Sequence, residues 1–282
     1  MSFAVPAAMM IASGSIHAVV NAIVKGRRQV EGREPIMAAR AITDASSAVI
    51  LLPAILFVPL PTGAWQWLGW SALAHVLYLY AMIRTYAVAD FSAAYPAMRG
   101  TAPALTAAVT VGLLGEAVRP LALMGVALIA GSLFALVIGK HLGRDALGWA
   151  LTTGAMTAVY TVIDVQGVRA APSVASYIVW DFVLIGSESL ALFALLSRGR
   201  IFADMRTQWQ PGVIAGGLSI VTYGLALWAF ALGPTAPLAA LRETGMATAL
   251  LISALFMGEA VTPRRAFAVA GILAGAAFIL TG

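Results

Sequence analysis

The sequence contains no cysteine and very little charge. The absence of cysteine excludes disulfide bonds and thiolate metal sites. Asp, Glu, Lys and Arg together make up 10% of the 282 residues, against 61% for hydrophobic residues, and the mean hydropathy is +0.92. An ordinary soluble domain carries about 25% charged residues. The composition therefore predicts a protein that lies within a lipid bilayer.

Two further absences narrow the fold class. No stretch alternates polar and apolar residues over about ten positions, as membrane barrel strands do, so helices are expected to cross the bilayer. Residues 1–20 lack the basic segment that opens a signal peptide, so we predict that they begin a permanent helix. The net charge of +5 is spread over short segments between apolar runs, which is typical of membrane proteins. No nucleic-acid partner is therefore expected.

Apolar runs of about 20 residues, the length that crosses a hydrocarbon core of about 30 Å, divide the chain into ten predicted spans. The spans cover residues 4–24, 36–60, 66–89, 91–114, 120–139, 147–165, 174–197, 212–232, 235–257 and 266–281. The connections between them are short, so nothing remains for a soluble domain. We predict an all-α membrane protein with ten transmembrane helices.

The two halves of the sequence repeat one another. GEAVRP at 115–120 and GEAVTP at 258–263 are 143 residues apart. The same offset aligns three further pairs, Tyr80 with Tyr223, Arg99 with Arg242, and Thr101 with Thr244. GSIHAVVNAIV and GAMTAVYTVID, in the first span of each half, align at an offset of 140. Residues 1–141 and 142–282 therefore supply five spans each, and an odd number of spans inverts one half relative to the other.

These features resemble the EamA-type proteins of the drug/metabolite transporter superfamily. The likeness rests on two fused five-helix halves, a Gly-Glu pair closing the fourth span of each, and the Gly-rich final spans MGVALIAGSLFAL and VAGILAGAAFIL. It covers essentially the whole chain and implies a secondary transporter. It says little about cargo, because members of the superfamily carry metabolites, amino acids, sugars, nucleotide sugars and drugs.

Basic residues are distributed unevenly between the two sides of the predicted bundle. Of the 17 Lys and Arg residues, eleven follow odd-numbered spans and two, Arg119 and Arg169, follow even-numbered spans. Because basic loops stay in the cytoplasm, this bias places both termini outside a cytoplasmic (inner) membrane. The family resemblance implies the reverse orientation. We follow the charge bias, since residues 1–24 carry no positive charge that would retain the N-terminus.

Several charged side chains fall inside the predicted spans, where insertion of a charge costs about 2.5–3.5 kcal/mol and favours a position facing the bundle interior. The arginines at such depth are Arg40, Arg84, Arg99 and Arg242, and the acids are Asp44, Asp181, Glu188 and Glu243, with Asp164 nearer a span end. Arg40 and Asp44 are four residues apart on one helix face, so we expect them to neutralise each other. Arg40 and Arg84 also remain candidates for contact with cargo.

Arg99 and Arg242 are the leading candidates for binding cargo, because the repeat predicts that they face each other near the axis between the halves. Pro96 and Pro103 flank Arg99, and we expect the fourth span to be kinked or broken there, since proline removes a backbone donor. Two guanidinium groups bind carboxylate or phosphonate oxygens in bidentate fashion. The alternative is a kinked packing helix with a structural salt bridge.

Glu243 has two candidate roles: it holds Arg242 in place, or it exchanges a proton for cargo. Asp181 is a second candidate for proton coupling. Aromatic residues that would supply walls and hydroxyl donors, or serve as plain packing, are Tyr80, Tyr95, Tyr223 and Trp180.

The remaining polar residues predict no cofactor and no metal. His17 and His75 are expected to be packed neutral side chains, and no spacing of His or carboxylates resembles a metal site. Glu116 and Glu259 lie at span ends. We expect them to contact loop backbone or basic residues rather than cargo.

Together these features predict a secondary transporter that moves a small polar, anionic or zwitterionic metabolite by alternating access. A proton or a counter-substrate is the expected coupling partner, and the chain is expected to function alone. No phosphate-binding loop or catalytic motif is present, so neither ATP hydrolysis nor enzyme activity is expected. Two alternatives stay open: an exporter of cationic or amphipathic compounds that uses Glu243 and Asp181, and a membrane scaffold without transport.

The charge bias leads to a prediction about topology. A C-terminal fusion to a reporter that fluoresces only in the cytoplasm should stay dark, because the C-terminus is predicted to lie outside. A bright signal from a folded fusion would contradict the predicted orientation.

Overall fold

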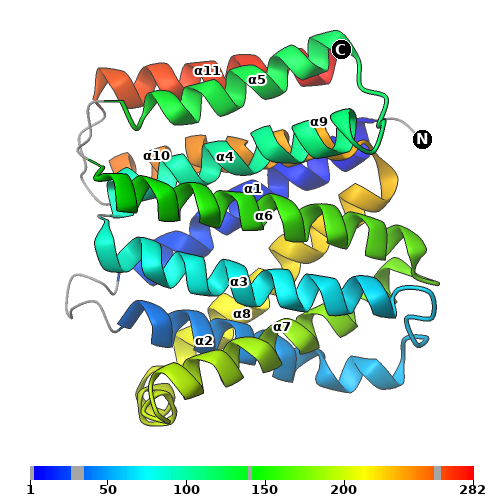
Figure 1. Ribbon diagram of the computed structural model, residues 1–282, viewed down its shortest axis with the longest axis vertical. Helices are drawn as coiled ribbons and strands as arrows, with labels where there is room; N and C mark the ends of the chain where they lie inside the picture. Colours follow the sequence, from blue (N-terminus) through cyan, green and yellow to red (C-terminus); the bar gives the residue numbers. More distant parts are fainter. Residues whose placement is uncertain (1–2, 27–34, 90, 139–141, 257–261) are drawn as a thin grey trace.

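The computed structural model describes residues 3–26, 35–89, 91–138, 142–256 and 262–282 (Figure 1). Within these ranges the chain is all-α, with no strand. The α-helices are α1 (Ala4–Gly26), α2 (Pro35–Leu51), α3 (Trp65–Val88), α4 (Phe91–Gly112), α5 (Pro120–Ala135), α6 (Arg144–Ala170), α7 (Val174–Leu196), α8 (Ile201–Leu232), α9 (Thr235–Leu241), α10 (Gly245–Phe256) and α11 (Pro263–Thr281). Two short 3₁₀ helices, η1 (Leu52–Leu56) and η2 (Arg242–Thr244), complete the described elements.

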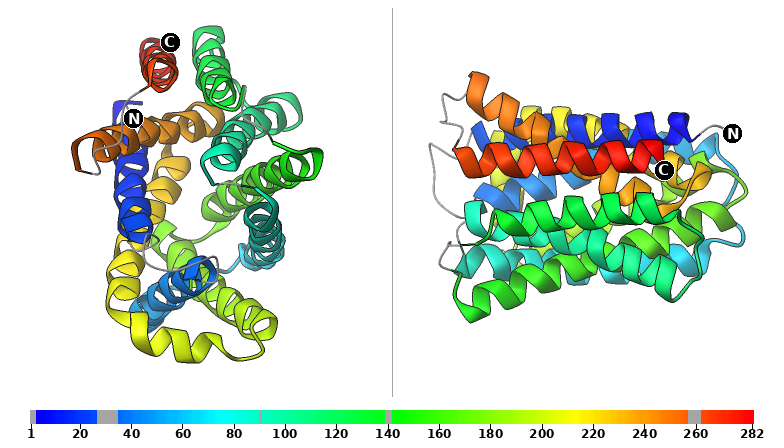
Figure 2. Two further views of the ribbon diagram at one scale, coloured as in Figure 1. Left: turned by 90° about the vertical axis from the view of Figure 1, so that its left-hand side faces the viewer. Right: turned by 90° about the horizontal axis from the view of Figure 1, so that it is seen from above.

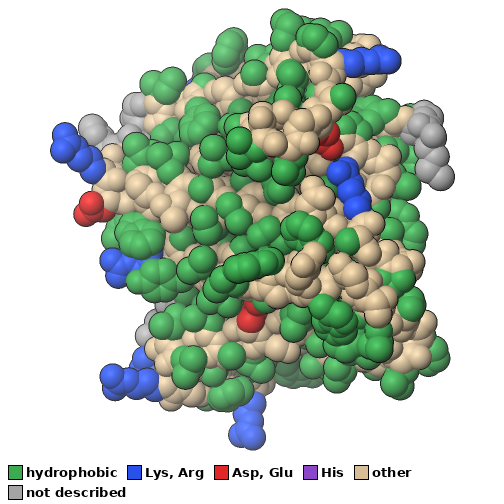
Figure 3. Space-filling view, turned by 45° about the vertical axis from the view of Figure 1, so that its right-hand side comes forward, with side chains coloured by type: hydrophobic (Ala, Val, Ile, Leu, Met, Phe, Trp, Pro, Cys, Tyr) green, Lys and Arg blue, Asp and Glu red, His purple; other side chains and the backbone are tan. Residues whose placement is uncertain are grey.

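Among the described residues, five stretches are long and apolar enough to cross a membrane. They are Ala39–Leu56, Arg144–Ala170, Val174–Leu196, Gly212–Leu232 and Pro263–Thr281. Figure 3 shows hydrophobic side chains spread over most of the face in view, with Lys and Arg concentrated toward its edges. Continuous exposed apolar surface of this kind is unfavourable in water and is what a lipid-facing surface requires. These features indicate a multi-pass membrane protein.

The helices lie alongside one another, and successive connections alternate between the two ends of the bundle (Figures 1 and 2). As a result, α1 begins and α11 ends at the same end. Seen along the helices, α5 packs against α11 at one extreme of the bundle, and α2 packs against α7 at the other. The remaining helices lie between these two pairs.

Each half of the sequence packs its first helix against the third helix of the other half. α1 packs on α8, and in the same way α6 packs on α3. Ser13 of α1 donates to the carbonyl oxygen of Thr222 in α8 at 2.6 Å, while the hydroxyls of Thr85 in α3 and Thr153 in α6 lie 2.9 Å apart. Buried hydroxyl pairs therefore join the matching helices at matching places.

Glycines allow close helix approach at matching places as well. A Cβ atom on Gly14 of α1 would lie 2.2 Å from the carbonyl oxygen of Arg242. One on Gly154 of α6 would lie 2.6 Å from the carbonyl oxygen of Met98 in α4. Both distances are too short for any side chain, so glycine is required where α1 and α6 cross their partners. Small residues at such crossings are typical of helices packed in membranes.

The helix interruption lies in the second half rather than the first. α4 runs unbroken from Phe91 to Gly112 with Pro96 and Pro103 inside it, so of the expected kink or break in the fourth span, the break is wrong. Its counterpart is divided into α9, η2 and α10. In η2 the chain tightens to a 3₁₀ turn, in which Thr244 Oγ1 donates to the carbonyl of Leu241 at 2.7 Å. Such a turn within a helix often marks a hinge.

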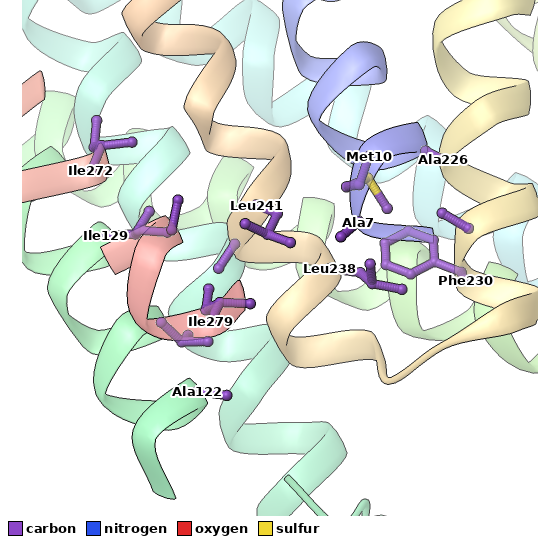
Figure 4. Packing of buried hydrophobic residues seen from close by; sticks show 14 of the residues in the cluster. Ala7, Met10, Ala122, Ile129, Ala226, Phe230, Leu238, Leu241, Ile272 and Ile279 are labelled. Atoms are coloured by element: carbon purple, nitrogen blue, oxygen red, sulfur yellow. The ribbon is translucent and has the colours of Figure 1, made fainter. Parts of the chain in front are cut away.

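The largest buried apolar cluster surrounds α9. Figure 4 shows Leu238 and Leu241 between side chains of α1 and α8 on one side and those of α5 and α11 on the other. Leu238, Leu241 and Met10 are fully buried. This packing positions the residues of η2, which directly follow Leu241, in the interior of the bundle.

Candidate functional site

Arg99 of α4 and Glu243 of η2 meet where the two halves of the sequence contact each other. Nε of Arg99 lies 2.9 Å from Oε2 of Glu243, and the two side chains are 16% and 4% exposed. The N–H direction falls outside hydrogen-bond geometry, so the contact is an ion pair. Of the two roles considered for Glu243, holding Arg242 or exchanging a proton, the first is not what the structure shows, because the ion pair that Glu243 makes is with Arg99.

Arg242 lies beside this ion pair but has a different environment. Its guanidinium carbon lies 5.4 Å from the centre of the Tyr223 ring, in the geometry of a cation–π contact. Its Nε is buried and has no hydrogen-bond partner among the described residues. Arg99 makes a similar contact with Tyr95, at 5.8 Å. Four of the predicted site residues are thus arranged as two arginine–tyrosine pairs.

His17 of α1 lies at the same place. Gly14, one turn earlier on α1, lies against the carbonyl oxygen of Arg242, so His17 belongs to the part of α1 that packs on η2. The side chain is partly buried.

Tyr223 connects the arginines to a buried acid that sequence reasoning placed too near a span end. Its hydroxyl donates to Oδ2 of Asp164 in α6, and the hydroxyl of Tyr177 in α7 donates to Oδ1 at 2.9 Å. Asp164 is 1% exposed. Gly167, one turn further along α6, leaves room for the Tyr177 ring, since a Cβ there would lie 2.2 Å from it. An aspartate in an apolar helix was the available signal for this residue.

Asp181 lies one turn beyond Tyr177 on the same face of α7. The side chain is buried, and its Oδ2 has no hydrogen-bond partner among the described residues. The neighbouring Trp180 packs edge-on against Trp65 at the first turn of α3, with ring centres 5.1 Å apart. Trp180, a predicted site residue, therefore packs near an end of α3.

The predicted pairing of Arg40 with Asp44 is confirmed. Nε of Arg40 lies 2.8 Å from Oδ2 of Asp44, and Ser189 of α7 donates to the same oxygen at 2.8 Å. His75, expected to be a packed side chain, is 4% exposed, and its Nδ1 lies 2.6 Å from Oε1 of Glu188. Both acids are thus held by partners and join α2 and α3 to α7.

Tyr80 and Arg84 do not line the interior. Tyr80 is 45% exposed and Arg84 is exposed, so both lie on the outer face of α3, where they contact Trp149 of α6. The matched hydroxyl pairs explain the error, because Thr222 corresponds to Thr85, an offset of 137 rather than 143. The counterpart of Tyr223 is then position 86, six residues from position 80. Six residues rotate a helix by about 240°, which points Tyr80 toward a different face.

At the end of the bundle where α1 begins, Glu116 closes a contact between the halves. Its Oε1 and Oε2 accept from the backbone N–H of Thr235 at 2.8 and 2.9 Å, Oε1 accepts from the hydroxyl of Thr235, and Oε2 accepts from the N–H of Ala236. A carboxylate is favoured at such a helix N-terminus. Gly115, three residues after the end of α4 and next to Glu116, has a φ of 68°, which favours glycine. Glu116 therefore contacts backbone, as expected, while Glu259 lies outside the described residues.

Arg169 of α6 extends this contact. It lies 3.6 Å from Oε1 of Glu116 and donates to the carbonyl oxygens of Phe230 and Gly233 at 3.2 and 2.7 Å. These carbonyls belong to the last turn of α8, where a cation is favoured. At this end of the bundle, α6, α8, α9 and the segment after α4 are thus joined by hydrogen bonds and an ion pair.

Comparison with known proteins shows the fold and nothing more specific. No protein-family model and no curated protein matches the chain. A crystal structure of a protein that carries no functional name superposes with a TM-score of 0.67, covering 97% of this chain and 94% of the other at 17% identity. At that identity the likeness shows that both chains share one fold and leaves function open.

The ion pair leads to a prediction about stability. Glu243→Gln should lower the free energy of unfolding by about 3–5 kcal/mol, because it leaves the Arg99 charge buried without compensation. Adding Arg99→Gln should recover part of this loss. Unfolding of the purified single and double variants in detergent measures the coupling. Arg84→Gln, on the outer face, is the matched control, and additive effects of the two site substitutions would show that the pair is not coupled.

Proposed function

We propose that the chain is a ten-helix secondary transporter of the EamA type, built from inverted halves at residues 1–141 and 142–282. Three observations support the inverted repeat. First, α1 packs on α8 as α6 packs on α3. Second, α1 and α6 begin at opposite ends of the bundle. Third, glycines occur where α1 and α6 cross their partner helices. In this arrangement α9, η2 and α10 together form one crossing. Following the charge bias, the end where α1 begins faces away from the cytoplasm.

The observation that carries the proposal is the state of Arg242. A guanidinium whose Nε is buried without a hydrogen-bond partner among the described residues is costly in an apolar bundle, unless a ligand supplies the acceptor. Arg99, held by Glu243, lies nearby with part of its surface exposed. A carboxylate or phosphonate group on a small polar metabolite fits this pair, since each oxygen would accept a charge-assisted hydrogen bond.

Transport then proceeds by alternating access around these residues. The contacts of Glu116 with α9 keep the bundle closed at the end where α1 begins. The 3₁₀ turn η2 lies between α9 and α10 and carries both Arg242 and Glu243, so a change of angle at η2 moves the site and the closed end together.

The cationic alternative receives less support. Glu243 is already neutralised by Arg99, and Asp181 is only 2% exposed, so a large cation has no acidic group that it reaches directly. A scaffold without transport would not explain why Nε of Arg242 is buried with no hydrogen-bond partner among the described residues. The absence of catalytic motifs argues against an enzyme, as the sequence indicated.

Arg242→Gln tests the proposal. A thermal-shift screen of purified protein against amino acids, phosphonates, carboxylates and quaternary amines should find stabilising compounds among those with a negative group. Affinity for them should fall on the order of tenfold to a hundredfold in Arg242→Gln, because one charge-assisted contact is worth about 1.5–3 kcal/mol. Arg242→Lys should recover affinity only in part, since lysine lacks the bidentate geometry.

The matched control is Arg84→Gln, which removes an arginine from the outer face and should leave affinity unchanged. Two results would refute the proposed cargo class. One is stabilisation by quaternary amines alone, and the other is wild-type affinity for an anionic compound in a folded Arg242→Gln variant.

A further inference from the structure

The interior contains two carboxylates that the proposed cargo contacts do not use. Asp164 and Asp181 lie on α6 and α7, are 1% and 2% exposed, and are close enough for their charges to act on each other. Tyr177 joins them, since its hydroxyl donates to Asp164 and its helix position is one turn before Asp181. Two negative charges at this depth carry a large desolvation cost.

No cation among the described residues contacts this pair. On α7 the nearest further acid is Glu188, which is bound to His75 of α3, and on α2 Asp44 is already paired with Arg40. α8 contributes Tyr223, η1 has no ionisable side chain, and Arg242 reaches the pair only through the ring of Tyr223. The described part of the chain therefore supplies no cation that compensates the negative charge of the two aspartates.

The two aspartates differ in their hydrogen bonds. Both oxygens of Asp164 accept from tyrosine hydroxyls, which stabilise a negative charge there. Oδ2 of Asp181 accepts from no group among the described residues. A buried carboxylate in this condition is much more stable as the neutral acid. Within the pair, Asp181 is the residue on which a positive ion is needed.

Burial limits what that ion can be. A cargo molecule with an ammonium group would need an opening to Asp181, which is 2% exposed. A metal ion requires several oxygen ligands around one point, and no group of three or more acidic or histidine side chains among the described residues forms such a site. A proton requires neither an opening of molecular size nor a ligand shell.

We propose that Asp181 is a proton-binding site, and that Asp164 and Tyr223 connect it to the cargo-binding residue Arg242. The coupling part rests on the proposed transport function, whereas proton binding does not. Tyr223 is the connecting element because its ring lies under Arg242 while its hydroxyl donates to Asp164. Binding of a negative group to Arg242 reduces the positive field on this side and so favours protonation of the acidic pair.

Infrared spectroscopy tests the proton site without any cargo. The wild-type protein in detergent at neutral pH should show the carbonyl band of a protonated carboxylic acid, and Asp181→Asn should remove that band. Asp145→Asn is the matched control, because Asp145 is exposed in the first turn of α6, outside the buried pair, and its replacement should leave the band unchanged. Absence of the band in the wild type, or its persistence in Asp181→Asn, would overturn the proposal.

Thermal unfolding over a range of pH, in KCl and in NaCl, provides the second measurement. Asp181→Asn should fold, since Oδ2 loses no hydrogen bond to a described residue. Raising the pH removes the proton and leaves a buried charge, so the Tm of the wild type should fall relative to that of Asp181→Asn. Stabilisation of the wild type, but not the variant, by NaCl over KCl would identify Na⁺ instead and overturn the proton assignment.

These outcomes are independent of cargo binding. If Arg242→Gln leaves affinity unchanged while the infrared band behaves as expected, the proton site stands and the proposed cargo site fails. If the band is absent while Arg242→Gln loses affinity, the proposed cargo site stands and the proton site fails. Tyr223→Phe keeps the ring under Arg242 and removes the bond to Asp164. It should retain the infrared band and abolish the effect of pH on affinity at Arg242.

Discussion

The ion pair between Arg99 and Glu243 joins α4 to η2 inside a bundle that is otherwise largely apolar. Each charge alone would be costly there, so the two segments are held together by the need to keep the pair intact. η2 in turn is packed against Gly14 of α1, which no other residue type would allow. The positions of α1, α4 and η2 in the interior thus depend on two charged side chains and one glycine.

The pair also makes the two halves unequal. At the offset of 143 residues, Arg99 corresponds to Arg242, but Glu243 corresponds to Gly100, which lies against the ring of Phe134. One acid is therefore available for two arginines, and the structure gives it to Arg99. Arg242 is left over the ring of Tyr223 with a buried nitrogen unsatisfied among the described residues. A site with one excess positive charge follows directly from this difference between the repeats.

Much of the helical arrangement was predictable, because apolar run length and repeated motifs report on membrane crossing and on internal symmetry. The Arg40–Asp44 pair was predictable too, since both residues lie on one turn of one helix. Contacts between helices were not. The repeat offset is 143 around Arg99 but 137 around Thr85. This shift of six residues moves Tyr80 to a different face of its helix, so Tyr80 was misplaced.

Local sequence rules, such as the helix-breaking effect of proline, also did not predict where the helix is interrupted. Two prolines predict a break in α4, yet packing keeps that helix continuous, and the interruption occurs at Arg242–Thr244, where no proline is present. Asp164 was underestimated for a related reason. Its two tyrosine donors come from α7 and α8, so its importance is visible only after these helices are assembled around α6.

Access to the central residues from both sides of the membrane is the feature on which the proposed function depends. The cysteine-free sequence allows a direct measurement, in which Tyr95→Cys, beside Arg99, is exposed to a membrane-impermeant thiol reagent in vesicles of each orientation. Tyr80→Cys, on the outer face, is the control for a cysteine covered by lipid. Alternating access predicts labelling of Tyr95→Cys from both sides, with labelling from the end where α1 begins increased by Glu116→Gln. Labelling from one side only, or from neither, would contradict it.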